Sequence, residues 1–183
     1  MTDQEISLVR RRALNPERRT DFASQGCPDL ASPASYDLVA SSEREIGFSL
    51  WSDHRQVLVE LANGGFGPGD GLLGIHGGRV DDDGRSLIEL RHLILSPEEL
   101  KLPIIPLCDW GCGAWSMLDC QTGEILTCSE LGLKELGVTF NIWLSQWAGG
   151  KNWWQDMFEF DSVEVVDPKT GIRSKISKIK GFE

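Results

Sequence analysis

Two glycine-rich motifs have the composition of loops that bind phosphate or stabilise an oxyanion. Residues 69–74 read Gly-Asp-Gly-Leu-Leu-Gly, which matches the G-x-G-x-x-G pattern of dinucleotide-binding loops. Such a loop follows a strand and opens a helix, whereas this one follows a helical pattern and opens an apolar, strand-like run. His76-Gly77-Gly78 has the composition of an esterase oxyanion loop, but the sequence contains no G-x-S-x-G nucleophile motif. We interpret both motifs as structural turns.

The cysteines are the next residues whose type could support chemistry. Four of the five lie close together in the sequence: Cys108, Cys112, Cys120 and Cys128. Their C-x₃-C-x₇-C-x₇-C spacing lacks the compact ligand pairs of most structural zinc sites. Cys112 and Cys120 also share the parity that small apolar residues have on a strand. The odd count and the absence of a secretion signal favour free thiols in a reducing cytoplasm.

An acidic run, Asp81-Asp82-Asp83-Gly84, matches the centre of an EF-hand calcium loop. Aligned on Gly84, the first ligand position holds Arg79 and the last holds Leu90, so both ends of the loop lack their ligand. A solvated turn explains this run better than a calcium site.

The three histidines, His54, His76 and His92, lie outside any metal or nucleophile motif. An enzyme would require the fold to bring two of them together with a cysteine in a cleft. We therefore expect no enzyme activity, no cofactor and no metal.

The charge of the chain is uneven along its length. Its 183 residues carry a net charge of −10. Residues 20–160 hold eight Lys or Arg and twenty-one Asp or Glu, whereas residues 1–19 and 161–183 are slightly basic. An acidic body repels nucleic acids and anionic membranes and attracts basic proteins, although a merely solvated acidic surface has the same charge. No apolar run reaches the ~18 residues of a membrane span. For this reason and because the body is acidic, we expect neither a membrane partner nor a nucleic-acid partner.

Residues 1–34 are predicted to form an N-terminal arm that is partly ordered at best. Arg10-Arg11-Arg12 and Arg18-Arg19 flank Asn15-Pro16, and two further prolines break any long element. This basic cluster is short and lacks the interleaved aromatic residues of a nucleic-acid site. We expect a helix that begins near Arg10, or a disordered tail.

Apolar spacing predicts two helices and a tight loop in the next part of the chain. Residues 35–46 form the first helix, which Gly47 ends, with Tyr36, Val39, Ala40 and Ile46 on its apolar side. Residues 57–61 continue the pattern in a second helix. The five glycines of residues 64–71 then predict a fixed turn with Phe66 as its anchor, and residues 72–75 a short buried strand.

Residues 87–95 have helical spacing. Three strands are predicted after them, at residues 104–107, 113–119 and 124–128. Within residues 113–119, Ser116 and Leu118 should face one way and Trp115 and Met117 the other. Thr139 is expected to begin a helix with an aromatic core stripe. A hairpin of residues 163–166 and 172–179 is predicted in a C-terminal extension, residues 151–183.

Several of these segments occur in the order of a known family. They are Ile46-Gly47-Phe48-Ser49-Leu50, Asn63-Gly64-Gly65-Phe66-Gly67-Pro68-Gly69, Leu72-Leu73-Gly74, Asp109-Trp110-Gly111-Cys112-Gly113, and Thr139-Phe140 with Trp143, Leu144 and Trp147. On these segments, residues 35–150 resemble the SUKH superfamily, in the branch of the fungal cell-wall assembly regulators. The second and fourth segments together are its most specific part. Trp51 departs from the proline that the family often has after the leucine.

The resemblance implies a single α+β domain with helices packed on a mostly antiparallel sheet, and it brings no active site. Many bacterial members are immunity proteins that neutralise polymorphic toxins, often nucleases, whereas fungal members are regulatory interaction proteins. We therefore expect a cytoplasmic, non-catalytic immunity protein that binds a basic toxin domain. The alternative is a regulatory or scaffold protein without a toxin partner.

The expected contact residues lie near the two most specific segments. A toxin that cuts nucleic acid needs a cationic groove, which carboxylates can enter with electrostatically steered association. We expect Asp70, Asp109 and Glu130 as contacts and Trp110 as an aromatic anchor, with core packing as the alternative for Trp110. The remaining motif residues should serve the architecture: Asn63, Gly64, Gly65, Phe66, Gly67, Pro68, Gly69, Gly111, Cys112 and Gly113.

Overall fold

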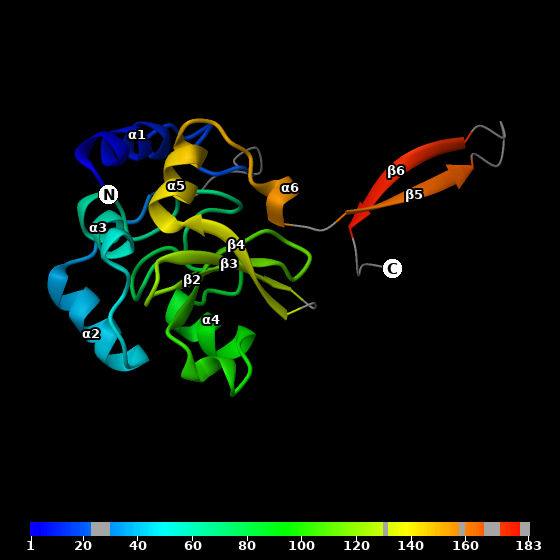
Figure 1. The fold of residues 1–183 in the computed structure, drawn as a ribbon. Coiled ribbons are helices and arrows are strands. Elements are labelled where there is room, and N and C mark those ends of the chain that lie inside the picture. Colours follow the sequence, from blue (N-terminus) through cyan, green and yellow to red (C-terminus); the bar gives the residue numbers. More distant parts are fainter. Residues whose placement is uncertain (23–29, 130–131, 158–159, 167–172, 180–183) are drawn as a thin grey trace.

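A computed structural model describes residues 1–22, 30–129, 132–157, 160–166 and 173–179, the last two ranges by their backbone only. It has the predicted α+β architecture (Figure 1). The helices are α1 (Asp3–Ala13), α2 (Tyr36–Ile46), α3 (Ser52–Glu60), α4 (Leu87–Ile94), the 3₁₀ helix η2 (Glu99–Lys101), α5 (Phe140–Ala148) and α6 (Trp154–Met157). The strands are β1 (Ile104–Asp109), β2 (Trp115–Asp119), β3 (Glu124–Ser129), β4 (Gly132–Thr139), β5 (Phe160–Val166) and β6 (Arg173–Ile179). Within these ranges, no helix combines the length and the apolar character that crossing a membrane demands.

The main sheet is an antiparallel meander in the order β1-β2-β3-β4. In the view of Figure 1, α5 lies above this sheet and α4 below it, and buried side chains of both helices belong to one core. The side chains of β2 alternate as predicted: Leu118 joins the main core, and Met117 joins a smaller cluster with Leu95 after α4. Strands β5 and β6 form a separate two-stranded sheet, as predicted, and the turn between them lies outside the described residues.

Helix α2 begins and ends where its sequence predicts. The side chain of Ser35 accepts a hydrogen bond from the N–H of Leu38, and Gly47 ends the helix at a φ of 86°. Val39 and Ile46 are buried, but Tyr36 is 72% exposed. The predicted apolar side was therefore wrong at Tyr36 and at Ala40, which are both exposed.

The N-terminal segment differs most from its prediction. Helix α1 begins at Asp3, well before Arg10, because Thr2 and Glu5 cap each other's backbone N–H groups. Its buried side chains Ile6 and Val9 belong to the same core as the helices and sheet that follow. Residues 1–22 are therefore part of the domain, and its core does not begin at residue 35.

Candidate functional site

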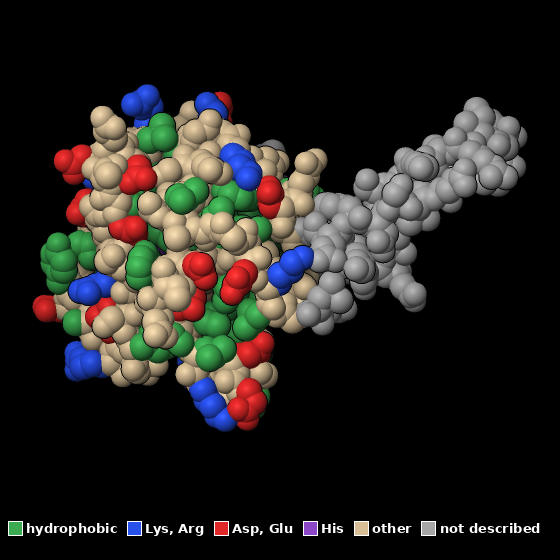
Figure 2. Space-filling view, in the orientation of Figure 1, with side chains coloured by type: hydrophobic (Ala, Val, Ile, Leu, Met, Phe, Trp, Pro, Cys, Tyr) green, Lys and Arg blue, Asp and Glu red, His purple; other side chains and the backbone are tan. Residues whose placement is uncertain are grey.

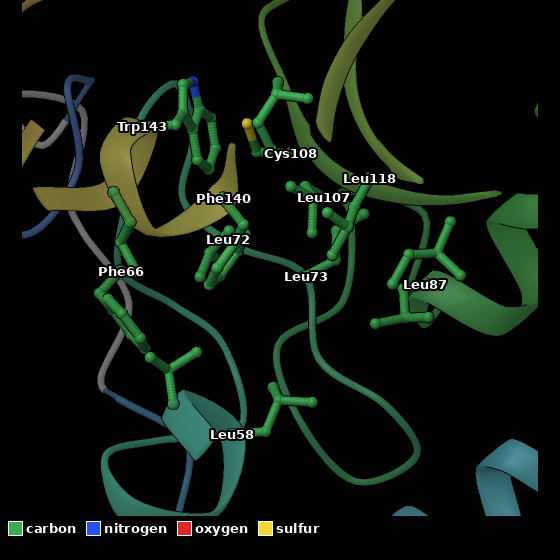
Figure 3. Close-up of a cluster of buried hydrophobic side chains, with 14 of the residues drawn as sticks. Leu58, Phe66, Leu72, Leu73, Leu87, Leu107, Cys108, Leu118, Phe140 and Trp143 are labelled. Atoms are coloured by element: carbon green, nitrogen blue, oxygen red, sulfur yellow. The ribbon is translucent and has the colours of Figure 1, made fainter. Parts of the chain in front are cut away.

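The glycine loop, residues 63–71, folds back on itself and is anchored in the core. Gly65 N–H donates to Leu72 O and Leu72 N–H donates to Phe66 O, each at 2.8 Å. Phe66 is fully buried, and Figure 3 shows it in one cluster with Leu72 and Phe140. At Gly64, φ is +85° and a Cβ would lie 2.5 Å from Leu72 O, so only glycine fits. The loop does not open a helix, and residues 72–75 are buried but do not form the predicted strand.

Asn63 holds the segment that follows the loop. Its side chain accepts a hydrogen bond from Ile75 N–H at 3.0 Å and donates to His76 O at 3.2 Å, while its carbonyl accepts from Arg79 N–H. Gly78 packs so closely that a Cβ there would lie 2.3 Å from Asn63 Cγ. Asn63 therefore ties the end of the glycine loop to residues 75–79.

Replacing Asn63 with alanine should lower the free energy of unfolding by about 2–3 kcal/mol, because it leaves the buried Ile75 N–H and nearby carbonyl groups unpaired. Chemical denaturation measures the change. The control is Asn152→Ala, at an exposed asparagine that accepts one hydrogen bond, from Trp154 N–H; its cost should stay below about 1 kcal/mol. Equal losses for the two variants would contradict this role of Asn63.

A second segment, residues 19–21, supports the loop from outside. Thr20 forms a parallel bridge with Gly67, and Gly67 N–H donates to Arg19 O at 2.8 Å. The carboxylate of Asp21 accepts from Gly69 N–H at 3.0 Å, and Asp21 N–H donates to Gly69 O. No motif in the sequence marks Asp21 for this role.

The glycine loop and the Asp109–Gly113 segment touch each other. Asp70 N–H donates to Asp109 O at 3.1 Å. A Cβ on Gly69 would lie 2.6 Å from that same carbonyl oxygen, so glycine permits this approach. The fold therefore brings together two of the three acidic residues expected to contact a partner, Asp70 and Asp109.

Asp81 and Asp82 join this pair around a hollow of about 20 Å³, which Arg79 also lines. We call Asp70, Asp81, Asp82 and Asp109 the aspartate surface. Asp81 orders its own turn, because its side chain accepts from Asp83 N–H and Arg85 N–H, which confirms the turn predicted from this run. A volume of this size holds about one water molecule, so the hollow can take an ammonium-sized group but no larger ligand.

Charge is only partly balanced at the aspartate surface. Asp70 pairs with Arg79 at 3.1 Å, and Asp81 with Arg85 at 3.4 Å. Asp109 has no ion pair within the described ranges; its side chain accepts from Gly111 N–H at 2.7 Å. Burial raises the pKa of Asp109, and the neighbouring charges of Asp70 and Asp82 raise it further. A cation from outside would relieve this repulsion.

The other expected contact residues do not add to this surface. Trp110 is 1% exposed and donates its indole N–H to Ser116 Oγ at 2.8 Å, so it packs in the core and is not a surface anchor. Glu130 lies outside the described residues. Cys112 is exposed at the tip of the β1–β2 turn with a φ of 53°, between Gly111 and Gly113, which also have positive φ. All three residues of this turn therefore have left-handed backbone conformations.

The thiols and imidazoles lie apart. Cys108 and Cys120 are buried, which raises the pKa of both and keeps the thiols protonated. His54 is buried against Phe140, whereas His76 pairs with Glu45 on the surface at 2.8 Å. In the part of the chain that the structure describes, no three His, Cys, Asp or Glu side chains are arranged to hold a metal ion.

Comparisons with protein-family models, with curated proteins and with solved structures give no match for this chain.

Proposed function

We propose that the chain is a non-catalytic protein-binding domain, an immunity protein that neutralises a basic toxin domain by direct binding. The aspartate surface carries this proposal. It gathers carboxylates from the glycine loop, from residues 81–82 and from the end of β1, and each of these segments is held by the hydrogen bonds described above. Rigid, preorganised carboxylates are what a cationic groove requires of a competitor.

The hollow suits a lysine side chain of the partner. About 20 Å³ accommodates one ammonium group, which Asp82 and Asp109 can neutralise because neither is paired with a cation among the described residues. Further acidic side chains contribute at longer range: on the face in Figure 2 they are spread between basic and apolar ones. The net charge of −10 therefore steers a basic partner towards the chain, and the aspartate surface supplies the short-range contacts.

The test begins with the neighbouring genes. A large secreted-toxin gene beside this one supports the immunity role, whereas an isolated locus supports the regulatory alternative. The toxin domain of such a neighbour is expressed with the chain and assayed for growth arrest. Protection from arrest, with a complex recovered from the cells, is the result that we expect.

Removing three charges from the aspartate surface should weaken this complex. The variant Asp70→Asn/Asp82→Asn/Asp109→Asn keeps every side chain's shape and should lower affinity about 100-fold or more. Calorimetry measures it against Asp37→Asn/Glu98→Gln/Asp156→Asn, which removes the same charge from exposed sites elsewhere. Equal affinities for the two triple variants would mean that only the net charge of the chain matters. That result would contradict binding at the aspartate surface.

A second surface also has the composition of a protein interface. Tyr36 is 72% exposed beside a hollow of about 220 Å³, which Arg55 and Val59 of α3 also line. Tyrosine and arginine are frequent among the residues that dominate protein interfaces. In the neutralisation assay, loss of protection by Tyr36→Ala with full protection by the aspartate triple variant would move the binding site to α2 and α3.

A further inference from the structure

A hollow at the ends of α1 and α5 concentrates arginine residues in an otherwise acidic chain. Its volume is about 370 Å³, and Arg11, Arg12, Asn15 and Arg18 form its polar wall. We call it the arginine hollow. Small-molecule sites range from about 300 to 1,000 Å³, so the space suits a small ligand. It shares no lining residue with the aspartate surface.

One arginine of the hollow is fixed, and two carry uncompensated charge. Arg12 pairs with Asp21 at 3.0 Å and lies 4.1 Å from the centre of the Trp147 ring. Arg11 and Arg18 are exposed, and over the described ranges neither side chain pairs with a carboxylate. Burial is the main cause that lowers the pKa of Arg12; Asp21 opposes it, and the positive charge of Arg18 adds to it. Three arginine side chains therefore lie around this hollow, and among the described residues only that of Arg12 is paired with a carboxylate.

Bonding to free helix carbonyl groups does not account for these two arginines. Basic residues in a last helical turn often bond the free carbonyl groups there. Arg11 lies in the last turn of α1, where Arg10 O already accepts from Leu14 N–H and Arg12 O from Asn15 N–H. Arg11 and Arg18 thus keep their guanidinium donors for another acceptor.

We propose that the arginine hollow binds the dianionic phosphate of a phosphate monoester. Two guanidinium groups match its charge of about −1.5 to −2 at pH 7, and their planar donors suit bidentate contact with phosphate oxygens. Leu8 and Ala148 provide an apolar wall for the group that the phosphate esterifies. This site is independent of the toxin-binding proposal, and its failure would leave that proposal intact.

Calorimetric titration of the full chain tests the site with phenyl phosphate and with phenyl sulfate, which has the same shape and a single charge. At pH 7.5, phenyl phosphate should bind at least about tenfold more tightly. A phosphoserine peptide forms a third arm: tighter binding than phenyl phosphate assigns the monoester to a protein, and weaker binding assigns it to a small molecule. Either order supports phosphate recognition, whereas equal affinity for the two phenyl esters, or no binding of phenyl phosphate, overturns it.

Charge-removing variants locate the site. Arg11→Gln and Arg18→Gln should each weaken phenyl phosphate binding about tenfold, since each removes one charged donor. The matched control is Arg44→Gln, at an exposed arginine in the last turn of α2 whose side chain bonds, among the described residues, only Ala40 O of its own helix. Affinity that falls equally in all three variants, or in none of them, would refute a site in the arginine hollow.

Discussion

Replacing Arg12 with methionine should lower the free energy of unfolding by about 3–5 kcal/mol, the usual cost of breaking a buried ion pair from one side. The two side chains of the Arg12–Asp21 pair are only 12% and 10% exposed. Arg12 also donates to Arg18 O at 2.8 Å and to Trp147 O. Without it, the carboxylate of Asp21 stays buried with Gly69 N–H as its main partner.

Chemical denaturation of three variants isolates this effect. Arg11→Met removes the adjacent, exposed arginine and should change stability by no more than about 0.5 kcal/mol. Arg12→Met/Asp21→Asn should recover at least about 1 kcal/mol relative to Arg12→Met, because no charge is then left buried. Equal stability of Arg11→Met and Arg12→Met would show that the Arg12–Asp21 pair does not stabilise the fold.

Acid should destabilise the protein through His54. Its imidazole is fully buried against Phe140, and neither ring nitrogen has a hydrogen-bond partner within the described residues. Burial lowers the pKa of His54 from 6.5 to about 3. Between pH 3 and pH 6.5, His54 therefore binds a proton in the unfolded chain but not in the native chain. Stability is complete above pH 6.5 and falls by about 1.4 kcal/mol per pH unit below it, about 4–5 kcal/mol by pH 3.

The variant His54→Leu separates this effect from other titrations. Asp21 and Asp109 have raised pKa values and favour the native state as pH falls, so the comparison with wild type is what isolates His54. His54→Leu should be at least as stable as wild type at pH 7.5 and lose less stability between pH 6.5 and 4. His92→Gln, at an exposed histidine, should keep the wild-type slope. A steep slope retained in His54→Leu would contradict the account.

The elements that local signals define were predictable. Ser35 and Gly47 delimit α2, and strict alternation with the Gln121–Gly123 turn predicts β2 and β3. Strand β4 escaped prediction because its apolar residues, Leu133, Leu136 and Val138, do not alternate. The pairing of β3 with β4 shifts register beside them, which accounts for the broken pattern.

Helix α1 was missed although its signals are present. Ile6, Val9 and Ala13 have helical spacing, and Thr2 with Glu5 forms a capping box. The arginine run and the prolines after it favour a later helix start or a disordered tail, against the capping box and the apolar spacing.

The candidate sites depend on contacts that local signals cannot predict. Asp70 and Asp109 are far apart in the sequence and meet because Asp70 N–H in the glycine loop donates to Asp109 O at the end of β1. The arginine hollow likewise needs α1 to pack on α5. Trp110 lies in the core, where its indole N–H donates to Ser116 Oγ, and no local signal decided between this position and a surface one.

Hydrogen–deuterium exchange of the chain, alone and with the neighbouring toxin domain, tests the central claim most directly. We predict new protection at residues 69–71, 80–83 and 109–113, which carry the aspartate surface, and little change at α2 and α3. Protection confined to α2 and α3, with unchanged exchange around Asp70 and Asp109, would contradict it.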